Sequence, residues 1–184
     1  MSWKFDYLFY KDFLDHKDIK LLNQFIEANH DGKEAIHNQA VGKKKTKTFI
    51  TAYQKIRHHL KNIQHWVNYL NERNFGYDIS NFKDPDGVLL NVYDSKQKGE
   101  YGWHMDSSRS DIFDVKITVL INVSTQKYEG GEFSLFSAGP IRVKELDTPG
   151  TLVLIKSAMN HKVDVITKGE RRTLTLFVHG PKFR

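Results

Sequence analysis

The hydrophobic positions in the first part of the chain recur at helical spacing. From about Tyr10 to Ala28 the apolar residues stand three or four apart, which predicts an amphipathic helix. The same spacing from about Ile50 to Arg73 predicts a second, longer helix. Both helices precede Gly76, so we expect a helical part of the chain at about residues 1–76.

After Gly76 the pattern changes to short β-branched runs separated by Gly, Pro, Asn and Asp, which is typical of strands and turns. The predicted strands are Val88–Tyr93, Ile117–Val123, Gly131–Phe136, Thr151–Ile155, Val163–Ile166 and Thr173–Val178. Helices first and strands afterwards predict an α+β fold, with the strands in a barrel or sandwich and the helices packed outside it. We expect one domain over residues 1–184, with its β-rich part at about 77–184.

Composition narrows the candidate chemistry. The chain has no cysteine, so any transition metal must be held by nitrogen and oxygen ligands. No export signal or long apolar stretch is present, so we expect a cytoplasmic protein without a membrane partner. The net charge of +6 and the basic run Lys43–Lys47 permit a nucleic-acid partner, although a solvated basic loop is the favoured interpretation.

Three residues are candidate metal ligands. His104 and Asp106 stand two apart, so in an extended chain both side chains point to the same face and can share one ion. An isolated H-x-D pattern is common by chance, but His161 follows the predicted strand Thr151–Ile155 and could supply a third ligand from a neighbouring strand. Two histidines and one carboxylate form the facial triad of non-haem iron(II) sites.

The segment that begins at Arg171 places polar side chains on one face of a strand. Arg171, Thr173 and Thr175 alternate with the apolar Leu174 and Leu176. Thr118 and Asn122 form a similar polar face on a second predicted strand, and Asn91 and Tyr93 on a third. These faces could point to water or into a shared polar pocket. In a pocket, the arginine could bind a carboxylate through two hydrogen bonds, whereas Arg172 would face the opposite side.

Several motifs occur in order along the second half of the chain. They are Leu90-Asn91-Val92-Tyr93, Gly102-Trp103-His104-Met105-Asp106, Thr118-Val119-Leu120, Tyr128-Glu129-Gly130-Gly131-Glu132-Phe133, Thr148-Pro149-Gly150-Thr151-Leu152, His161 and Gly169-Glu170-Arg171. Together they resemble the iron(II)- and 2-oxoglutarate-dependent dioxygenases over about residues 85–180, most closely the prolyl 4-hydroxylase-like branch. The short, cysteine-free chain would suit a bacterial or phage-encoded member.

The resemblance implies a double-stranded β-helix, or jelly roll, with iron(II) near one open end. It implies 2-oxoglutarate and O2 as cosubstrates, with ascorbate as a possible further cofactor. His104, Asp106 and His161 would be the catalytic metal ligands.

The resemblance also implies a site for the distal carboxylate of 2-oxoglutarate. Arg171 would bind this carboxylate with help from Tyr93 and Thr118, and Thr173 on the same strand face is a further expected contact. The family often has Lys where this chain has Arg171. The sequence leaves open whether Tyr101 or Asn122 also contacts the cosubstrate.

The implied activity is hydroxylation of a prolyl or other residue in a peptide or protein, and a free amino acid or other small molecule remains an alternative substrate. Trp103, Arg109 and the loop Ser107–Asp114 are candidate walls of the substrate site. Nucleic-acid demethylation is favoured only by the basic charge. A jelly roll that binds a ligand without catalysis is a third hypothesis, which the complete set of proposed ligands disfavours.

Overall fold

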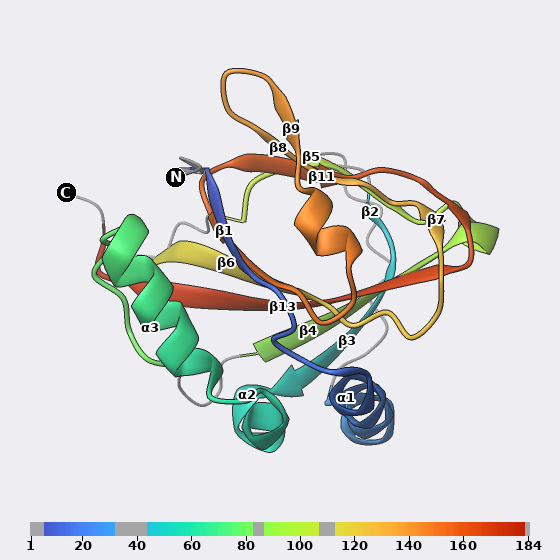
Figure 1. The fold of residues 1–184 in the computed structure, drawn as a ribbon, viewed down its shortest axis with the longest axis horizontal. Coiled ribbons are helices and arrows are strands. Elements are labelled where there is room, and N and C mark those ends of the chain that lie inside the picture. Colours follow the sequence, from blue (N-terminus) through green and yellow to red (C-terminus); the bar gives the residue numbers. More distant parts are fainter. Residues whose placement is uncertain (1–5, 32–43, 83–86, 107–112, 183–184) are drawn as a thin grey trace.

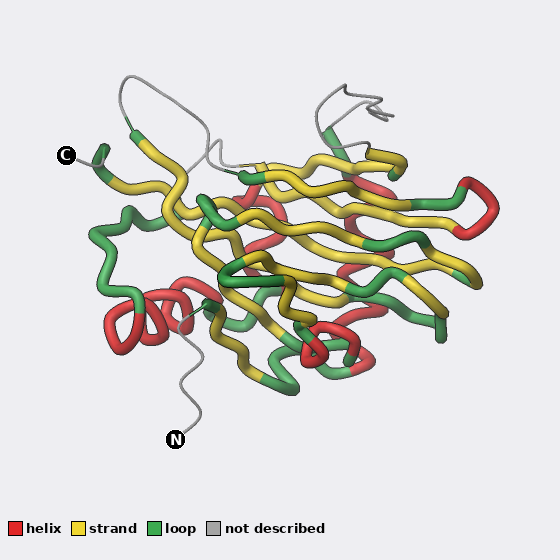
Figure 2. Tube along the Cα trace, turned by 90° about the horizontal axis from the view of Figure 1, so that it is seen from above, coloured by secondary structure: helices red, strands yellow, loops and turns green. Residues whose placement is uncertain are grey.

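The structure is a computed structural model that describes residues 6–31, 44–82, 87–106 and 113–182. Its strands pair antiparallel and form two main sheets (Figures 1 and 2). The six-stranded sheet has the order β1-β10-β6-β13-β4-β3 and consists of β1 (Tyr7–Tyr10), β3 (Lys47–Ala52), β4 (Gly87–Asp94), β6 (Asp114–Asn122), β10 (Leu152–Lys156) and β13 (Glu170–Gly180). The five-stranded sheet has the order β2-β5-β11-β8-β9 and consists of β2 (Lys44–Lys45), β5 (Glu100–His104), β8 (Phe133–Phe136), β9 (Pro140–Arg142) and β11 (Asn160–Val163). The short strands β7 (Glu129–Gly130) and β12 (Ile166–Lys168) form a separate pair.

The helices lie on one side of this β-structure. They are α1 (His16–Asn29), α2 (Tyr53–Ile56) and α3 (Ile63–Asn74). The structure also has the 3-10 turns η1 (Arg57–His59), η2 (Ser95–Gln97) and η3 (Lys144–Asp147), and Leu146 of η3 packs between the two sheets. Figure 1 shows the α-helices beside the six-stranded sheet, on the side away from β5, β8, β9 and β11. Among the described residues, no helix combines the length and apolar character needed to cross a membrane.

Two apolar clusters fill the space on either side of the six-stranded sheet. One joins the helices to the sheet and includes Leu22, Ile56 and Ile63 together with Leu174 and Leu176 of β13. The other lies between the two sheets and contains residues from both, including Leu120, Phe133, Leu135, Val153 and Val163. The six-stranded sheet therefore buries both faces, one against helices and one against the second sheet.

This architecture confirms the predicted α+β fold with a jelly-roll core and helices outside it. The predicted strands Val88–Tyr93, Ile117–Val123, Thr151–Ile155 and Thr173–Val178 correspond to β4, β6, β10 and β13, and Gly131–Phe136 contains β8. The prediction for Val163–Ile166 was wrong, because Val163 ends β11 and Ile166 begins β12 in a different sheet.

The first predicted helix begins later in the structure than in the prediction. Tyr7–Tyr10 form β1, which pairs with β10, and helix α1 starts only at His16. The start is fixed by Asp15 and Asp18, each of which accepts a hydrogen bond from the other's backbone N–H. This capping box satisfies two backbone donors at the helix terminus, so the helix begins there.

The second predicted helix is divided in the structure. Its first residues belong to β3, which pairs with β4, and only α2 and α3 are α-helical. Lys61 and Asn62 lie between η1 and α3 with positive φ angles of 39° and 56°, which interrupts the helix. Residues before Gly76 therefore contribute β1, β2 and β3 to the sheets, and the predicted division into a helical part and a β-rich part was incorrect.

Arg172 connects α1 to the six-stranded sheet through hydrogen bonds and ion pairs. Its guanidinium donates to the Asn23 side chain at 2.9 Å and also binds Glu27 on the same helix and Glu170 on its own strand. This agrees with the prediction that Arg172 faces away from the pocket side of β13. Arg172 thus has a structural role in the described part of the chain.

We expect Arg172→Ala to lower the free energy of unfolding by about 1–2 kcal/mol, because hydrogen bonds to charged groups are lost at a partly buried position. Urea denaturation followed by circular dichroism would measure the change. Lys168→Ala is the matched control, since its ion pair with Glu129 is largely exposed and should contribute little. Equal stability of Arg172→Ala and wild type would contradict the role assigned to Arg172.

Candidate active site

Pairing of β5 with β11 brings two histidines together. His104 and His161 are direct partners in the antiparallel register, and their ring centroids are 4.1 Å apart. Asp106 follows β5, and its backbone N–H donates to the Ser157 carbonyl at 3.0 Å. One ligand atom from each of His104, Asp106 and His161 lies within 4.8 Å of the others, so the three side chains could hold one metal ion.

Backbone carbonyls orient both imidazoles. Nδ1 of His104 lies 2.8 Å from the Gly102 carbonyl, and Nδ1 of His161 lies 3.0 Å from the Met159 carbonyl. Because a carbonyl can only accept, the proton of each neutral ring belongs on Nδ1, which leaves the Nε2 lone pair free for a metal. The two Nε2 atoms lie 3.6 Å and 3.2 Å from the Asp106 carboxylate oxygens.

The protonation states suit metal binding. Burial, followed by the charge of His161, lowers the pKa of His104 to about 4, so the ring is uncharged at neutral pH. Burial alone would raise the pKa of Asp106, but the neighbouring His161, His104 and Thr118 lower it. A neutral imidazole and an ionised carboxylate are the forms that bind metals.

A cavity of about 230 Å³ lies beside these three residues. Its lining comes from both sheets and consists of Lys44, Leu89, Asn91, Tyr93, Tyr101, His104, Asp106, Leu120, Phe133, His161, Val163, Arg171, Thr173, Thr175 and Phe177. The polar face predicted for β13 therefore points into a pocket and not to water, and Asn91 and Tyr93 of β4 lie in the same cavity.

Arg171 is a buried cation in this cavity. Its side chain is 1% exposed, and among the described residues no acceptor forms a hydrogen bond with its Nε or Nη1. The Tyr93 ring centroid is 5.6 Å from the guanidinium carbon, and burial raises the pKa of Tyr93. A buried guanidinium without an acceptor is costly, so this position fits a bound carboxylate.

Gly131 makes room for the Arg171 side chain. It has a positive φ of 69°, and a Cβ atom there would stand 2.1 Å from Ile166 Cδ1 and 3.1 Å from Arg171 Cδ. Glycine is the residue that tolerates both the conformation and the close approach. The Gly130-Gly131 pair thus precedes β8 and leaves space for the Arg171 side chain.

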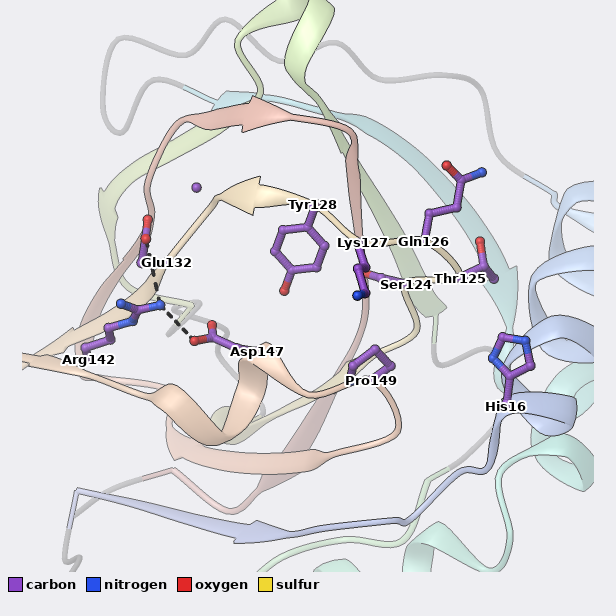
Figure 3. A pocket seen from close by; sticks show the side chains of 11 residues that line it. His16, Ser124, Thr125, Gln126, Lys127, Tyr128, Glu132, Arg142, Asp147 and Pro149 are labelled. Carbon is purple, nitrogen blue, oxygen red and sulfur yellow. Dashed lines mark hydrogen bonds and ion pairs between the residues drawn. The ribbon is translucent and has the colours of Figure 1, made fainter.

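A larger cavity of about 510 Å³ lies elsewhere, between the 124–132 segment and η3 (Figure 3). Three of its charged residues pair with one another, because Arg142 bridges Asp147 at 2.8 Å and Glu132 at 3.7 Å. All three of these side chains are at least one-third exposed. The smaller cavity, with its possible ligand cluster and buried arginine, is therefore the better candidate for an active site.

A comparison with protein families supports the smaller cavity as the active site. The model of the 2OG-Fe(II) oxygenase superfamily matches residues 88–179, which is half of the chain and contains the three clustered residues and Arg171. The chain belongs to this superfamily. As a 2OG-Fe(II) oxygenase it is a dioxygenase that uses iron(II), 2-oxoglutarate and O2. A comparison with curated protein sequences gives no match.

Solved structures share the fold of this oxygenase. A Pseudomonas putida prolyl-4-hydroxylase has a TM-score of 0.70 at 17% identity, covering 96% of this chain and 94% of that one. A Trichoplax adhaerens prolyl hydroxylase in complex with a hypoxia inducible factor peptide fragment has a TM-score of 0.62 at 16% identity, with coverages of 96% and 84%. The carbocyclase SnoK of nogalamycin biosynthesis has a TM-score of 0.68 at 12% identity, with coverages of 95% and 79%. At these identities the likeness shows the fold alone.

Thr118, for which a cosubstrate contact is expected, and Asn122, for which the sequence leaves one open, both form hydrogen bonds with other protein groups. Thr118 is not among the residues that line the cavity; its hydroxyl donates to Asp106 Oδ2 at 2.9 Å and lies 3.1 Å from the Ser157 hydroxyl. The Asn122 amide donates to Tyr128 and to the Leu146 carbonyl. Both side chains are buried, as expected of an inward-facing strand position, and the cosubstrate contact of Thr118 stays a prediction.

Sequence reasoning missed Lys44 as a residue of the cavity and left the role of Tyr101 open. Tyr101 stacks on His104 with ring centroids 3.4 Å apart, and Lys44 reaches the cavity from β2. The basic run that contains Lys44 is not a solvated loop in its described part, since Lys44–Lys45 form β2 and Lys47 begins β3. Trp103 is 39% exposed and does not line the cavity, while Arg109 and the rest of 107–112 lie outside the described residues.

We expect Thr118→Val to weaken metal binding about tenfold, because residues that orient a ligand typically contribute 10–100-fold to affinity. Competition with a metal indicator in the absence of 2-oxoglutarate would measure this. Thr51→Val is the matched control, since the Thr51 hydroxyl is buried in β3 away from the cavity. Unchanged metal affinity with weaker 2-oxoglutarate binding would instead assign Thr118 to the cosubstrate.

Proposed function

We propose that His104, Asp106 and His161 hold iron(II) and that Arg171 binds the distal carboxylate of 2-oxoglutarate. The observation that carries this proposal is the buried Arg171, whose Nε and Nη1 have no acceptor among the described residues, in the same cavity as the two-histidine, one-carboxylate cluster. The donor set is the one that non-haem iron(II) oxygenases use. Iron(II), when bound, supplies the oxygen activation that couples decarboxylation of 2-oxoglutarate to succinate with oxidation of a C–H bond.

The chain's own residues would prepare this chemistry. The two histidines and Asp106 would hold the metal and leave room for the keto acid and O2. Thr118 holds the Asp106 carboxylate through its hydroxyl, and Tyr101 stacks on the His104 ring. Apolar neighbours such as Leu120 and Phe133 line the same cavity and would exclude water from the reacting groups.

We propose a prolyl or other residue of a peptide as the substrate. Large apolar side chains are exposed next to the proposed ligands: Trp103 at 39% and Met105 at 53% flank His104, and Phe136 at 50% is the neighbour of Trp103, with ring centroids 5.8 Å apart. Exposed aromatic surface of this kind suits contact with a polypeptide. The prolyl hydroxylase from Trichoplax adhaerens, which shares this fold, is in complex with a peptide fragment.

We expect Arg171→Ala to weaken 2-oxoglutarate binding by roughly thirtyfold or more, because loss of a buried charge pair costs about 2–5 kcal/mol and each 1.4 kcal/mol is tenfold. Calorimetry on the zinc-loaded protein would measure binding without turnover. Arg172→Ala is the control, because its side chain faces α1 and should leave binding unchanged. Equal damage from both variants would contradict the assignment of faces on β13.

Substrate-stimulated succinate formation tests the activity. The iron-loaded protein should form succinate slowly with 2-oxoglutarate alone and faster with the correct member of a proline-containing peptide panel, whereas Asp106→Ala should form none. Trp103→Ala should raise the KM for that peptide while it leaves 2-oxoglutarate binding unchanged. A folded, iron-loaded protein that binds no 2-oxoglutarate would refute the proposed function, and stimulation only by nucleic acid would refute the peptide substrate.

A further inference from the structure

Lys44 brings a second cation into the active-site cavity. Strand β2 pairs with β5 so that Lys44 is the register partner of Tyr101, and both side chains line the cavity with His104 and Asp106. Nζ of Lys44 lies 5.1 Å from the Tyr101 ring centroid, and the same ring stacks on His104. Lys44 therefore lies on the metal side of the cavity, whereas Arg171 enters from the opposite sheet.

Among the residues that the structure describes, no carboxylate forms an ion pair with the Lys44 ammonium, whereas the adjacent Lys45 pairs with Glu100 at 3.3 Å. Burial lowers the pKa of Lys44, and the charge of Asp106 acts in the opposite direction. A partly buried ammonium without an ion-pair partner is costly, and an anion that binds within reach would stabilise it.

Bound 2-oxoglutarate alone would not neutralise the positive charge of the cavity. Lys44 and Arg171 are the only lysine and arginine among the described lining residues, and Asp106 is the only carboxylate there. Two cationic side chains, one carboxylate, an iron(II) ion and a doubly charged 2-oxoglutarate leave one positive charge in excess. On the proposed function, 2-oxoglutarate already uses the metal for its keto acid end and Arg171 for its distal carboxylate, so Lys44 remains for another ligand.

We propose that Lys44 binds a carboxylate of the primary substrate and so determines specificity. This inference rests on the proposed function and deepens it. A single carboxylate supplies the one negative charge that the loaded cavity lacks, and it would position the neighbouring C–H bond beside the metal. The carboxylate could come from a free amino acid or from an acidic side chain next to the oxidised residue of a peptide.

Matched pairs of small ligands separate these two sources. One pair is L-proline and L-prolinamide, extended to other amino acids and their amides. The second pair is the blocked dipeptides acetyl-Pro-Asp-amide and acetyl-Pro-Asn-amide. Calorimetry on the zinc-loaded, 2-oxoglutarate-saturated protein measures binding, and succinate formation by the iron protein measures stimulation.

We expect at least one carboxylate member to bind about tenfold more tightly than its amide partner, which corresponds to 1.4 kcal/mol. Lys44→Met should abolish this preference, and Lys44→Arg should retain most of it. Lys45→Met is the control, because Lys45 lies outside the cavity and should keep the full preference. A preference confined to free amino acids identifies the free acid as the source, and one confined to the Asp dipeptide identifies an acidic side chain.

Two results would overturn the inference while the proposed function stands. One is a wild-type protein that binds 2-oxoglutarate but shows no carboxylate preference in any pair. The other is a Lys44→Met variant that loses affinity for 2-oxoglutarate itself as strongly as Arg171→Ala, which would assign Lys44 to the cosubstrate. A wild-type protein that binds no 2-oxoglutarate would overturn both the inference and the function on which it rests.

Discussion

The antiparallel register between β5 and β11 is the constraint on which the active site depends. It places His161 directly opposite His104, so backbone hydrogen bonds and not flexible side chains set the spacing of the two imidazoles. A slip of one residue would turn one ring to the other face of the sheet. The backbone N–H of Asp106 donates to the Ser157 carbonyl. The Gly102 and Met159 carbonyls orient the imidazoles of His104 and His161. Rigid strands thus hold the cluster in place before any ion binds.

A second constraint is that the two faces of the six-stranded sheet have different roles, one in packing and one in lining the cavity. On β13, Leu174 and Leu176 pack against the helices, while Arg171 and Thr173 line the cavity. Helix packing therefore supports the very strand that carries the buried guanidinium. The neighbouring Arg172 binds α1 from the opposite face, so two consecutive arginines serve stability and ligand binding separately.

Much of this arrangement could be predicted from the sequence, because strand alternation is a local property. The period of two along β4 and β13 placed Asn91, Tyr93 and Arg171 on one face, and the H-x-D spacing placed His104 beside Asp106. What could not be predicted depends on distant partners. β2 is two residues long and exists because it pairs with β5, so nothing local distinguishes Lys44 from a solvated lysine. Thr118 shares the predicted face, but only the position of Asp106 and Ser157 shows which group its hydroxyl contacts.

The position of β13 has a consequence for how the protein reaches its native state. Although β13 follows all the other described strands in sequence, it lies inside the six-stranded sheet, between β6 and β4. Until it docks, β6 and β4 present unpaired edges, and an intermediate of this kind is prone to associate with other chains. Such long-range pairing also slows folding, since the ends of a long loop must meet before any bond forms. Because β13 carries Arg171, the protein should gain its ability to bind 2-oxoglutarate in the same late folding step that completes the six-stranded sheet. Binding of 2-oxoglutarate to the native state would then stabilise the completed sheet.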